Sequence, residues 1–277
     1  IRVVVGTAVY TGDFDVPTSR LSATQSNQGA NIADITGTAT KLLIHSNQVK
    51  DSSSNAHNIT YVGTAKDTPD VTSRANSGAH ANFGSSAMLF DGNSDYIHLP
   101  NGTDVDNLKG GNTQSFTVEA QVKFGATTDV YFMGPKDPSN PIDNNNRTWA
   151  LGVMFSTGHI RWLSTSSSAT SWSIDQKWST SMSPNTWYHI AIVYDASGTN
   201  GSLKCYQDGT ALSVSGTDNT GLAKSNYAIR SFTDSNYVYA FGSHSSYYLN
   251  GSMDEIRISD INRTASGQDL ALSGGSF

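Results

Sequence analysis

The sequence predicts an all-β protein, folded as a sandwich or a barrel of antiparallel strands. Short stretches in which apolar and polar residues alternate recur along the chain, and turn-forming residues separate them. Apolar residues almost never recur with the helical period. Strands that recur in this way, with turn signals between them, are typical of sandwiches and barrels.

The composition is that of a folded domain and excludes several functions. The 277 residues are 36% hydrophobic, which is enough for a sizeable core in one or two domains. The net charge of −6 without a Lys/Arg cluster argues against a nucleic-acid partner. No stretch reaches the roughly 18 apolar residues of a membrane span. Cys205 is the only cysteine, so an internal disulfide is excluded.

Most of the expected elements are strands. The β-branched run at residues 1–5 has the composition of a buried strand, whereas the polar, unpatterned residues 16–40 predict a linker. Residues 116–124 alternate apolar and polar side chains, which predicts a half-buried antiparallel strand. Residues 187–194 are apolar on both faces and predict a central strand. Further strands are expected at residues 87–92, 95–100, 237–242 and 253–259.

Two hairpins are expected as well. Residues 148–155 and 159–164 are strand-like and are separated by Ser-Thr-Gly. Residues 203–214 alternate around Asp208-Gly209, a dipeptide that tolerates the positive φ angles of a type I′ turn.

The order of these segments resembles a known family. The segments are TKLLIHSN, DSSSNAHNITYVG, ANFGSSAMLFDGNSDYIHLP, FTVEAQVKF, NTWYHIAIVYD, KCYQDG and LNGSMDEIRIS. Their succession over residues 41–263 is similar to that of laminin G-like members of the concanavalin A-like lectin and glucanase superfamily. The resemblance implies a concanavalin A-like jelly-roll sandwich of two antiparallel sheets, often with a structural calcium ion. Together with the lead-in IRVVVGTAVYTGDF, the sequence resembles the laminin G-like domains of tail-fibre and other virion structural proteins of marine bacteriophages.

The resemblance also implies a division of the chain. Residues 41–265 are expected to form the jelly-roll domain and residues 266–277 a C-terminal tail. Residues 1–15 allow two interpretations, the closing strand of a preceding repeat or an extra edge strand of this domain. Under either one, the polypeptide is expected to extend upstream of residue 1.

The acidic residues do not form a catalytic pattern. Glucanases of this fold use closely spaced acids on one strand, because one carboxylate attacks while another donates a proton about 5 Å away. Glu119 has Gln121 and Lys123 beside it instead, and the adjacent Asp254 and Glu255 point to opposite faces of a strand. We therefore expect no enzymatic activity.

Calcium is the cofactor that the sequence favours. Ca²⁺ binds six to eight oxygen atoms, and the turn FDGNSDY supplies Asp91, Asn93 and Asp95. Asp254 has the parity of the apolar residues that follow it, so it is expected to face the core, where an unpaired carboxylate is costly. These four residues are the predicted ligands. Hydrogen bonds alone are the alternative explanation of the turn, because Asp caps turns well.

Aromatic side chains among polar residues predict a glycan-binding site. An aromatic ring stacks on the apolar face of a sugar, and amide or carboxylate groups hold its hydroxyls. Loop aromatics that close the open ends of the sandwich are the alternative. The candidate residues are Trp172, Trp178, Tyr247 and Tyr248, with Asp143 and Asn145 on a long oxygen-rich loop.

Three hypotheses follow for the function. The first is a non-catalytic virion domain, in a tail fibre or a surface decoration, that contributes to host adhesion by binding a surface polysaccharide. The second is an architectural spacer or capsid-decorating module without a ligand. The third is a carbohydrate-binding module of a secreted bacterial adhesin or enzyme. The expected location is the virion surface or the extracellular space. The expected partners are glycans and other virion proteins. A homo-oligomer is possible, although no heptad segment would drive it.

Overall fold

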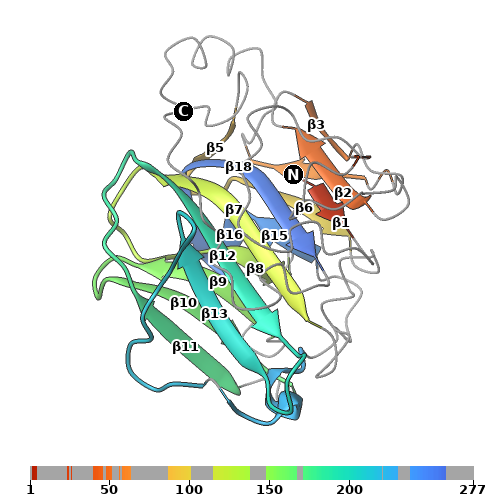
Figure 1. The fold of residues 1–277 in the computed structure, drawn as a ribbon. Helices are drawn as coiled ribbons and strands as arrows, with labels where there is room; N and C mark the ends of the chain where they lie inside the picture. The colour runs from red at the N-terminus through yellow and green to blue at the C-terminus, as the bar shows by residue number, and fades with distance from the viewer. Residues whose placement is uncertain are drawn as a thin grey trace.

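Two large antiparallel sheets face each other in the computed structural model, which confirms the predicted all-β jelly-roll sandwich (Figure 1). The structure describes residues 2–4, 24, 26, 40–45, 48–51, 56, 58–63, 87–100, 115–137, 148–166, 171–219, 221–229 and 238–259. Within these ranges, no helix has the length and hydropathy of a membrane span.

One sheet has seven strands. They are β4 (Thr60–Val62), β6 (Tyr96–Pro100), β8 (Val130–Lys136), β9 (Trp149–Met154), β10 (His159–Ser164), β11 (Ile174–Ser179) and β15 (Val238–Phe241). Their order in the sheet is β11-β10-β9-β8-β15-β6-β4.

The other large sheet has six strands. They are β5 (Met88–Asp91), β7 (Phe116–Phe124), β12 (Trp187–Asp195), β13 (Ser202–Gln207), β14 (Thr210–Ala211) and β18 (Asn250–Ser259). Their order is β14-β13-β12-β7-β18-β5, so the predicted central strand, β12, does lie inside the sheet.

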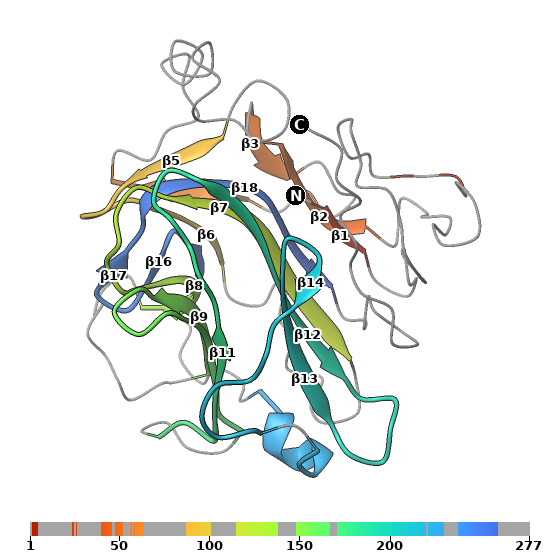
Figure 2. The ribbon, with the colours of Figure 1, turned by 60° about the vertical axis from the view of Figure 1, so that its left-hand side comes forward.

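Three smaller elements complete the described chain. The hairpin of β16 (Ser243–His244) and β17 (Tyr247–Tyr248) follows β15, and η3 (Lys224–Tyr227) is a short 3-10 helix. A separate sheet holds β1 (Arg2–Val4), β2 (Thr40–His45) and β3 (Gln48–Asp51). Its strands β1 and β2 lie against β18 (Figure 2).

The expected divisions of the chain are described only in part. Residues 2–4 pair with β2 and join neither large sheet at its edge. Whether residues 1–15 come from a preceding repeat stays a prediction. The expected tail, residues 266–277, and most of the expected linker lie outside the described residues.

The core lies between the two large sheets and is rich in aromatic rings. Trp149 and Trp162 stack with their ring centroids 5.2 Å apart, and Phe116 contacts Trp162 at 5.6 Å. Burying a large apolar side chain stabilises a fold by about 1.5–3 kcal/mol, so these rings are a main source of stability. The largest side chains that are fully buried are Trp149, Trp162, Trp178, Tyr194, Tyr206, Phe90, Phe124, Phe132 and Phe241.

Both predicted hairpins are present. Strand β9 pairs antiparallel with β10, as a hairpin requires. Between β13 and β14, Asp208 has φ 50° and Gly209 has φ 79°, as a type I′ turn requires. The turn chemistry therefore identified both connections correctly.

Strand β7 differs from its prediction because it is buried on both faces. Thr117, Glu119, Gln121 and Lys123, the residues expected to face water, are at most 6% exposed. Glu119 meets His189 of the neighbouring strand, with 2.9 Å between Oε2 and Nε2. An alternating pattern identifies the core face of a strand, but it does not say whether the polar face is covered.

A β-bulge in β18 overturns the predicted orientation of Asp254. The register with β7 shifts between Asp254 and Arg257, and Glu255 has φ 46°. Met253 and Ile256 are both fully buried in the core, whereas Asp254 stands opposite Gln121 on the outer face. The bulge adds one residue between Asp254 and the apolar residues that follow. The prediction that Asp254 faces the core assumed regular alternation with those residues, and it was therefore wrong.

Residues 213–215 close one side of the sandwich. Trp178 and Val214 form an isolated antiparallel bridge, and the N–H of Ser215 donates to the Lys177 carbonyl at 2.9 Å. The chain thereby passes from β14, at the edge of the six-stranded sheet, to the edge strand β11 of the seven-stranded sheet (Figure 2).

Candidate functional site

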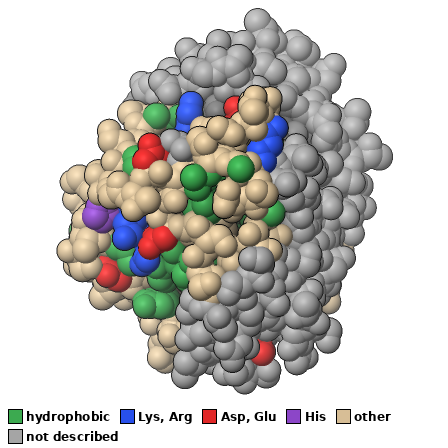
Figure 3. Space-filling view, turned by 90° about the horizontal axis from the view of Figure 1, so that it is seen from below, with side chains coloured by type: hydrophobic (Ala, Val, Ile, Leu, Met, Phe, Trp, Pro, Cys, Tyr) green, Lys and Arg blue, Asp and Glu red, His purple; other side chains and the backbone are tan. Residues whose placement is uncertain are grey.

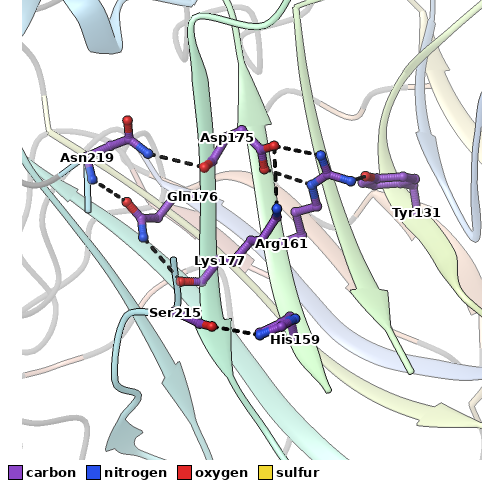
Figure 4. A network of polar contacts seen from close by, with 8 residues as sticks. All are labelled: Tyr131, His159, Arg161, Asp175, Gln176, Lys177, Ser215 and Asn219. Carbon is purple, nitrogen blue, oxygen red and sulfur yellow. Dashed lines mark hydrogen bonds and ion pairs between the residues drawn. The ribbon is translucent and has the colours of Figure 1, made fainter. Parts of the chain in front are cut away.

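The outer face of the seven-stranded sheet carries an ordered polar network (Figure 4). Arg161 on β10 donates from Nε and Nη2 to the two carboxylate oxygens of Asp175 on β11, at 2.8 and 2.7 Å. Its Nη1 donates to the Tyr131 hydroxyl at 2.8 Å. Tyr131 belongs to β8, two strands away, and Gly152 lies opposite both Tyr131 and Arg161. A Cβ on Gly152 would come within 2.6 Å of the Tyr131 ring, so this glycine lets the two side chains meet across β9.

Asp175 is ionised and Tyr131 is neutral near neutral pH. Burial acts to raise the pKa of Asp175, but the hydrogen bonds and charge of Arg161 outweigh it and hold this pKa below its usual value. Burial raises the pKa of Tyr131 to about 12. Lys177 Nζ lies 3.8 Å from the Asp175 carboxylate. The side chains of Arg161, Asp175 and Lys177 are 26–39% exposed, so the surface offers donors and an acceptor to a solute.

Aromatic side chains lie next to the network. Tyr247 is 42% exposed and is the one large hydrophobic side chain that the described residues leave open to solvent. It meets Tyr131 edge to face, with ring centroids 5.2 Å apart. Half-buried Trp172 packs against the apolar cluster of Tyr131, Ala150, Met154 and Leu163. Apolar and charged side chains also lie beside each other in the space-filling view from below (Figure 3).

Residues 213–219 brace the network at its edge strand. The N–H of Asn219 donates to Gln176 Oε1 at 2.8 Å, and its Nδ2 donates to the Asp175 carbonyl at 3.2 Å. His159 Nε2 and Ser215 Oγ are 2.8 Å apart (Figure 4). Because both side chains and backbone are tied, Asp175 is held in place before any solute arrives.

The structure brings together some of the predicted glycan-binding residues. Tyr247 contacts Tyr131, and Trp172 packs against the apolar cluster to which Tyr131 belongs. The centroid of the Tyr248 ring lies 4.3 Å from Lys136 Nζ. Asp143 and Asn145 lie outside the described residues.

The prediction of an exposed Trp178 is wrong, because this side chain is 1% exposed in the core. Ile174, Gln176 and Trp178 alternate along β11 and all face inward, although the neighbouring sequence is polar. Strand parity, rather than local composition, determines where this ring lies.

Hydrogen bonds close the turn that was predicted to bind calcium. Asp91 Oδ1 accepts from the N–H groups of Asn93, Ser94 and Asp95 at 2.8, 3.0 and 3.2 Å. Asp95 Oδ2 in turn accepts from the N–H of Asp91 at 3.1 Å. The alternative explanation of this turn, hydrogen bonding, therefore accounts for its geometry.

Asp254 does not join this turn. Asn250 of β18 lies opposite Asp91, and Asp254 is four residues further along the strand, roughly 13 Å away at 3.3 Å per residue. The four predicted ligands thus cannot share one ion. Among the described residues, no three His, Cys, Asp or Glu side chains are placed to hold a metal. Calcium binding stays a prediction, which melting curves with calcium and with a chelator would test.

The Asp91 turn leads to a pH-dependent prediction. Burial acts to raise the pKa of Asp91, but the N–H groups of Ser94, Asn93 and Asp95 outweigh it and hold the pKa below 3.8. A carboxylate whose pKa is lower in the folded state than in the unfolded state stabilises the fold at pH values above its unfolded-state pKa. This stabilisation disappears as the pH falls through the folded-state pKa. Asp91→Asn should therefore cost about 0.5 kcal/mol of unfolding free energy at pH 7, since this group is mostly solvated.

Urea titrations of both proteins between pH 7 and pH 2.5 would measure this cost. We expect the difference between them to shrink below pH 4. A difference that stays constant with pH would contradict the role of the charge.

The Glu119–His189 pair lies on the outer face of the other sheet. The two residues are 3% and 9% exposed, and the Asp208 carboxylate accepts from the N–H of His189 at 2.8 Å. This pair was missed in the sequence because it joins residues 70 positions apart. This pair is buried, whereas the side chains of the network on the seven-stranded sheet are partly exposed.

Comparisons with known proteins agree with this fold. A family model described as the concanavalin A-like lectin/glucanases superfamily matches residues 91–267. No curated protein sequence matches the chain.

Solved structures are similar to the chain at low identity. The binding domain of botulinum neurotoxin serotype D is 12% identical with a TM-score of 0.48, covering 78% of this chain and 46% of its own. A SAP-like pentraxin from Limulus polyphemus is 16% identical with a TM-score of 0.37, covering 55% and 66%. The CBM40 of the Ruminococcus gnavus IT-sialidase, bound to α2,3-sialyllactose, is 10% identical with a TM-score of 0.42, covering 58% and 84%. The chain thus spans about half the length of the neurotoxin chain.

Proposed function

Because the chain belongs to the concanavalin A-like lectin/glucanases superfamily, we propose that it is a non-catalytic glycan-binding domain. The proposed binding surface is the outer face of the seven-stranded sheet around Tyr247, Tyr131 and Arg161.

The exposed ring of Tyr247 beside a fixed polar network carries this proposal. A sugar offers an apolar face to an aromatic ring and hydroxyls to donors and acceptors around it. Tyr247 provides the ring, and its contact with Tyr131 limits how the ring can turn. Arg161, Asp175 and Lys177 provide hydrogen-bonding groups that are already ordered, which lowers the entropy cost of binding.

The same network is poorly suited to glycoside hydrolysis. That reaction needs two carboxyl groups, one of which must be protonated to act as the general acid. Asp175 is paired with Arg161, and its lowered pKa keeps it ionised at neutral pH.

Glycoside cleavage by the purified protein that disappears in Glu119→Gln would contradict a non-catalytic role.

We place this binding function in host adhesion by a virion, in a tail fibre or a surface decoration. The support is the resemblance of the motif order and of the lead-in sequence to virion laminin G-like domains. The location would be the virion surface or the extracellular space, with other virion proteins or further copies of the chain as neighbours. Upstream sequence encoding related virion repeats would support this context, whereas a secreted enzyme upstream would favour a carbohydrate-binding module.

Tyr247→Ala is expected to weaken glycan binding at least about tenfold, because the stacking surface is lost. Tyr247→Phe keeps the ring and should bind within a few-fold of the wild type. A broad glycan array identifies the bound sugar, and titration calorimetry with that sugar measures the three affinities.

Two results would contradict the proposal. Wild-type protein that binds no glycan on the array would favour the architectural spacer. Equal affinities of Tyr247→Ala and the wild type would place sugar binding on another surface.

A further inference from the structure

The hairpin that carries Tyr247 is too small to hold itself in place. Strands β16 and β17 pair only Ser243 with Tyr248 and His244 with Tyr247. An isolated two-stranded hairpin is marginally stable at best in water. The base of this hairpin continues into β15 and β18, and its two strands lie against β8, so contacts with β8 contribute to its position.

Lys136, at the end of β8, makes the central contacts. Its Nζ donates to Ser243 Oγ at 2.9 Å and to the Ser245 carbonyl at 2.5 Å. Ser243 Oγ donates in turn to the Tyr247 carbonyl at 2.7 Å. A chain of hydrogen bonds therefore connects the ammonium group to the backbone of the residue whose ring is exposed.

Aromatic rings enclose the same ammonium group. Nζ lies 4.3 Å from the ring centroid of Tyr248 and 5.0 Å from that of Tyr96. Cations are attracted to the faces of such rings at these distances. Because Tyr248 belongs to the hairpin and Tyr96 to β6, Lys136 links the hairpin to the sheet on two sides.

We propose that Lys136 is a positioning residue of the binding surface, whose ammonium group holds the Ser243–Tyr248 hairpin on β8 and so keeps the Tyr247 ring above Tyr131. The inference rests on the proposed function, since it gives that site its supporting residue. The holding of the hairpin can nevertheless be measured without any sugar.

Because Lys136 is buried, its ammonium group is not expected to contribute much to the stability of the whole fold. The residue is 2% exposed, and this burial lowers the pKa of its ammonium group to about 8. The fold thus disfavours the charged form relative to water, and replacing a buried charge by an apolar group of similar size is often neutral for stability. Loss of the ammonium group should accordingly loosen the hairpin without unfolding the sandwich.

Lys136→Met keeps most of the side-chain stem and removes the ammonium group. Hydrogen exchange measured by mass spectrometry should be at least about tenfold faster in peptides covering residues 243–249, because several contacts are lost together. Peptides covering residues 187–195 of β12 should exchange at the wild-type rate. Ser243→Ala removes the relay to Tyr247 without altering the charge, and we expect it to accelerate the same peptides.

Lys123→Met is the matched control. Lys123 is also a buried lysine beside an aromatic ring, with Nζ 5.4 Å from the Trp187 centroid, but it lies in the six-stranded sheet. Its replacement should leave exchange at residues 243–249 unchanged.

Unchanged exchange at residues 243–249 in both Lys136→Met and Ser243→Ala would overturn the proposal. Equal acceleration of β12 and the hairpin would overturn it too, because it would show a global effect. On the glycan array, Lys136→Met should lose signal as Tyr247→Ala does. If Tyr247→Ala binds normally while Lys136→Met accelerates the hairpin, the proposed function fails and the holding role of Lys136 stands.

Discussion

Replacing Trp162 with alanine is expected to lower the free energy of unfolding by about 3–5 kcal/mol. The side chain is 1% exposed, stacks on Trp149 at 5.2 Å and contacts Phe116 of the opposite sheet at 5.6 Å. Its removal leaves a cavity between the two sheets that rigid strands cannot close. A loss of this size is a large part of the stability of an ordinary domain.

Denaturant titration followed by tyrosine and tryptophan fluorescence would measure this loss. Trp172→Ala is the matched control, because Trp172 lies half-buried on the outer face, in the small cluster around Tyr131. We expect that control to cost about 1 kcal/mol, since less apolar surface is buried there. Similar losses in the two variants would show that the layer between the sheets is not the main core.

The strands were predictable because their signals are local. Alternation and turn residues identified the β9–β10 hairpin, the Asp208-Gly209 turn and the inner strand β12. The prediction that one face of β7 is exposed to solvent was wrong, because the polar residues of that face are buried and Glu119 pairs with His189 of another strand. Burial of a polar face depends on tertiary packing, which a single segment does not encode.

The candidate site was predictable only in part. The exposed position of Tyr247 agrees with its polar surroundings in the sequence. Tyr131, Arg161 and Asp175 were missed, because their contacts depend on the register of four neighbouring strands and on the absence of a side chain at Gly152. The orientation of Asp254 was also mispredicted, because the sequence gives no sign of the β-bulge that follows this residue. The extra residue of the bulge places the carboxylate on the outer face.

Gly251→Ala is expected to cost about 2–5 kcal/mol of unfolding free energy, the second large effect. Gly251 lies in β18 between Phe90 of β5 and Phe124 of β7, with φ 152°. A Cβ at this position would lie 2.0 Å from the Lys123 carbonyl oxygen and 3.1 Å from its carbon. Both atoms are backbone inside a sheet, so neither can rotate away as a side chain could.

Two control glycines separate the causes of this loss. Gly216 has φ 79° and no atom within 4 Å of the position that a Cβ would take, so Gly216→Ala measures backbone strain alone, about 1 kcal/mol. Gly198 meets only Asn200 O at 3.4 Å, and Gly198→Ala should change stability by less than about 0.5 kcal/mol. If Gly251→Ala lost no more than Gly216→Ala, the strands β7 and β18 would have room to separate. The pairing of Gly251 with Phe124 would then be looser than the backbone geometry requires.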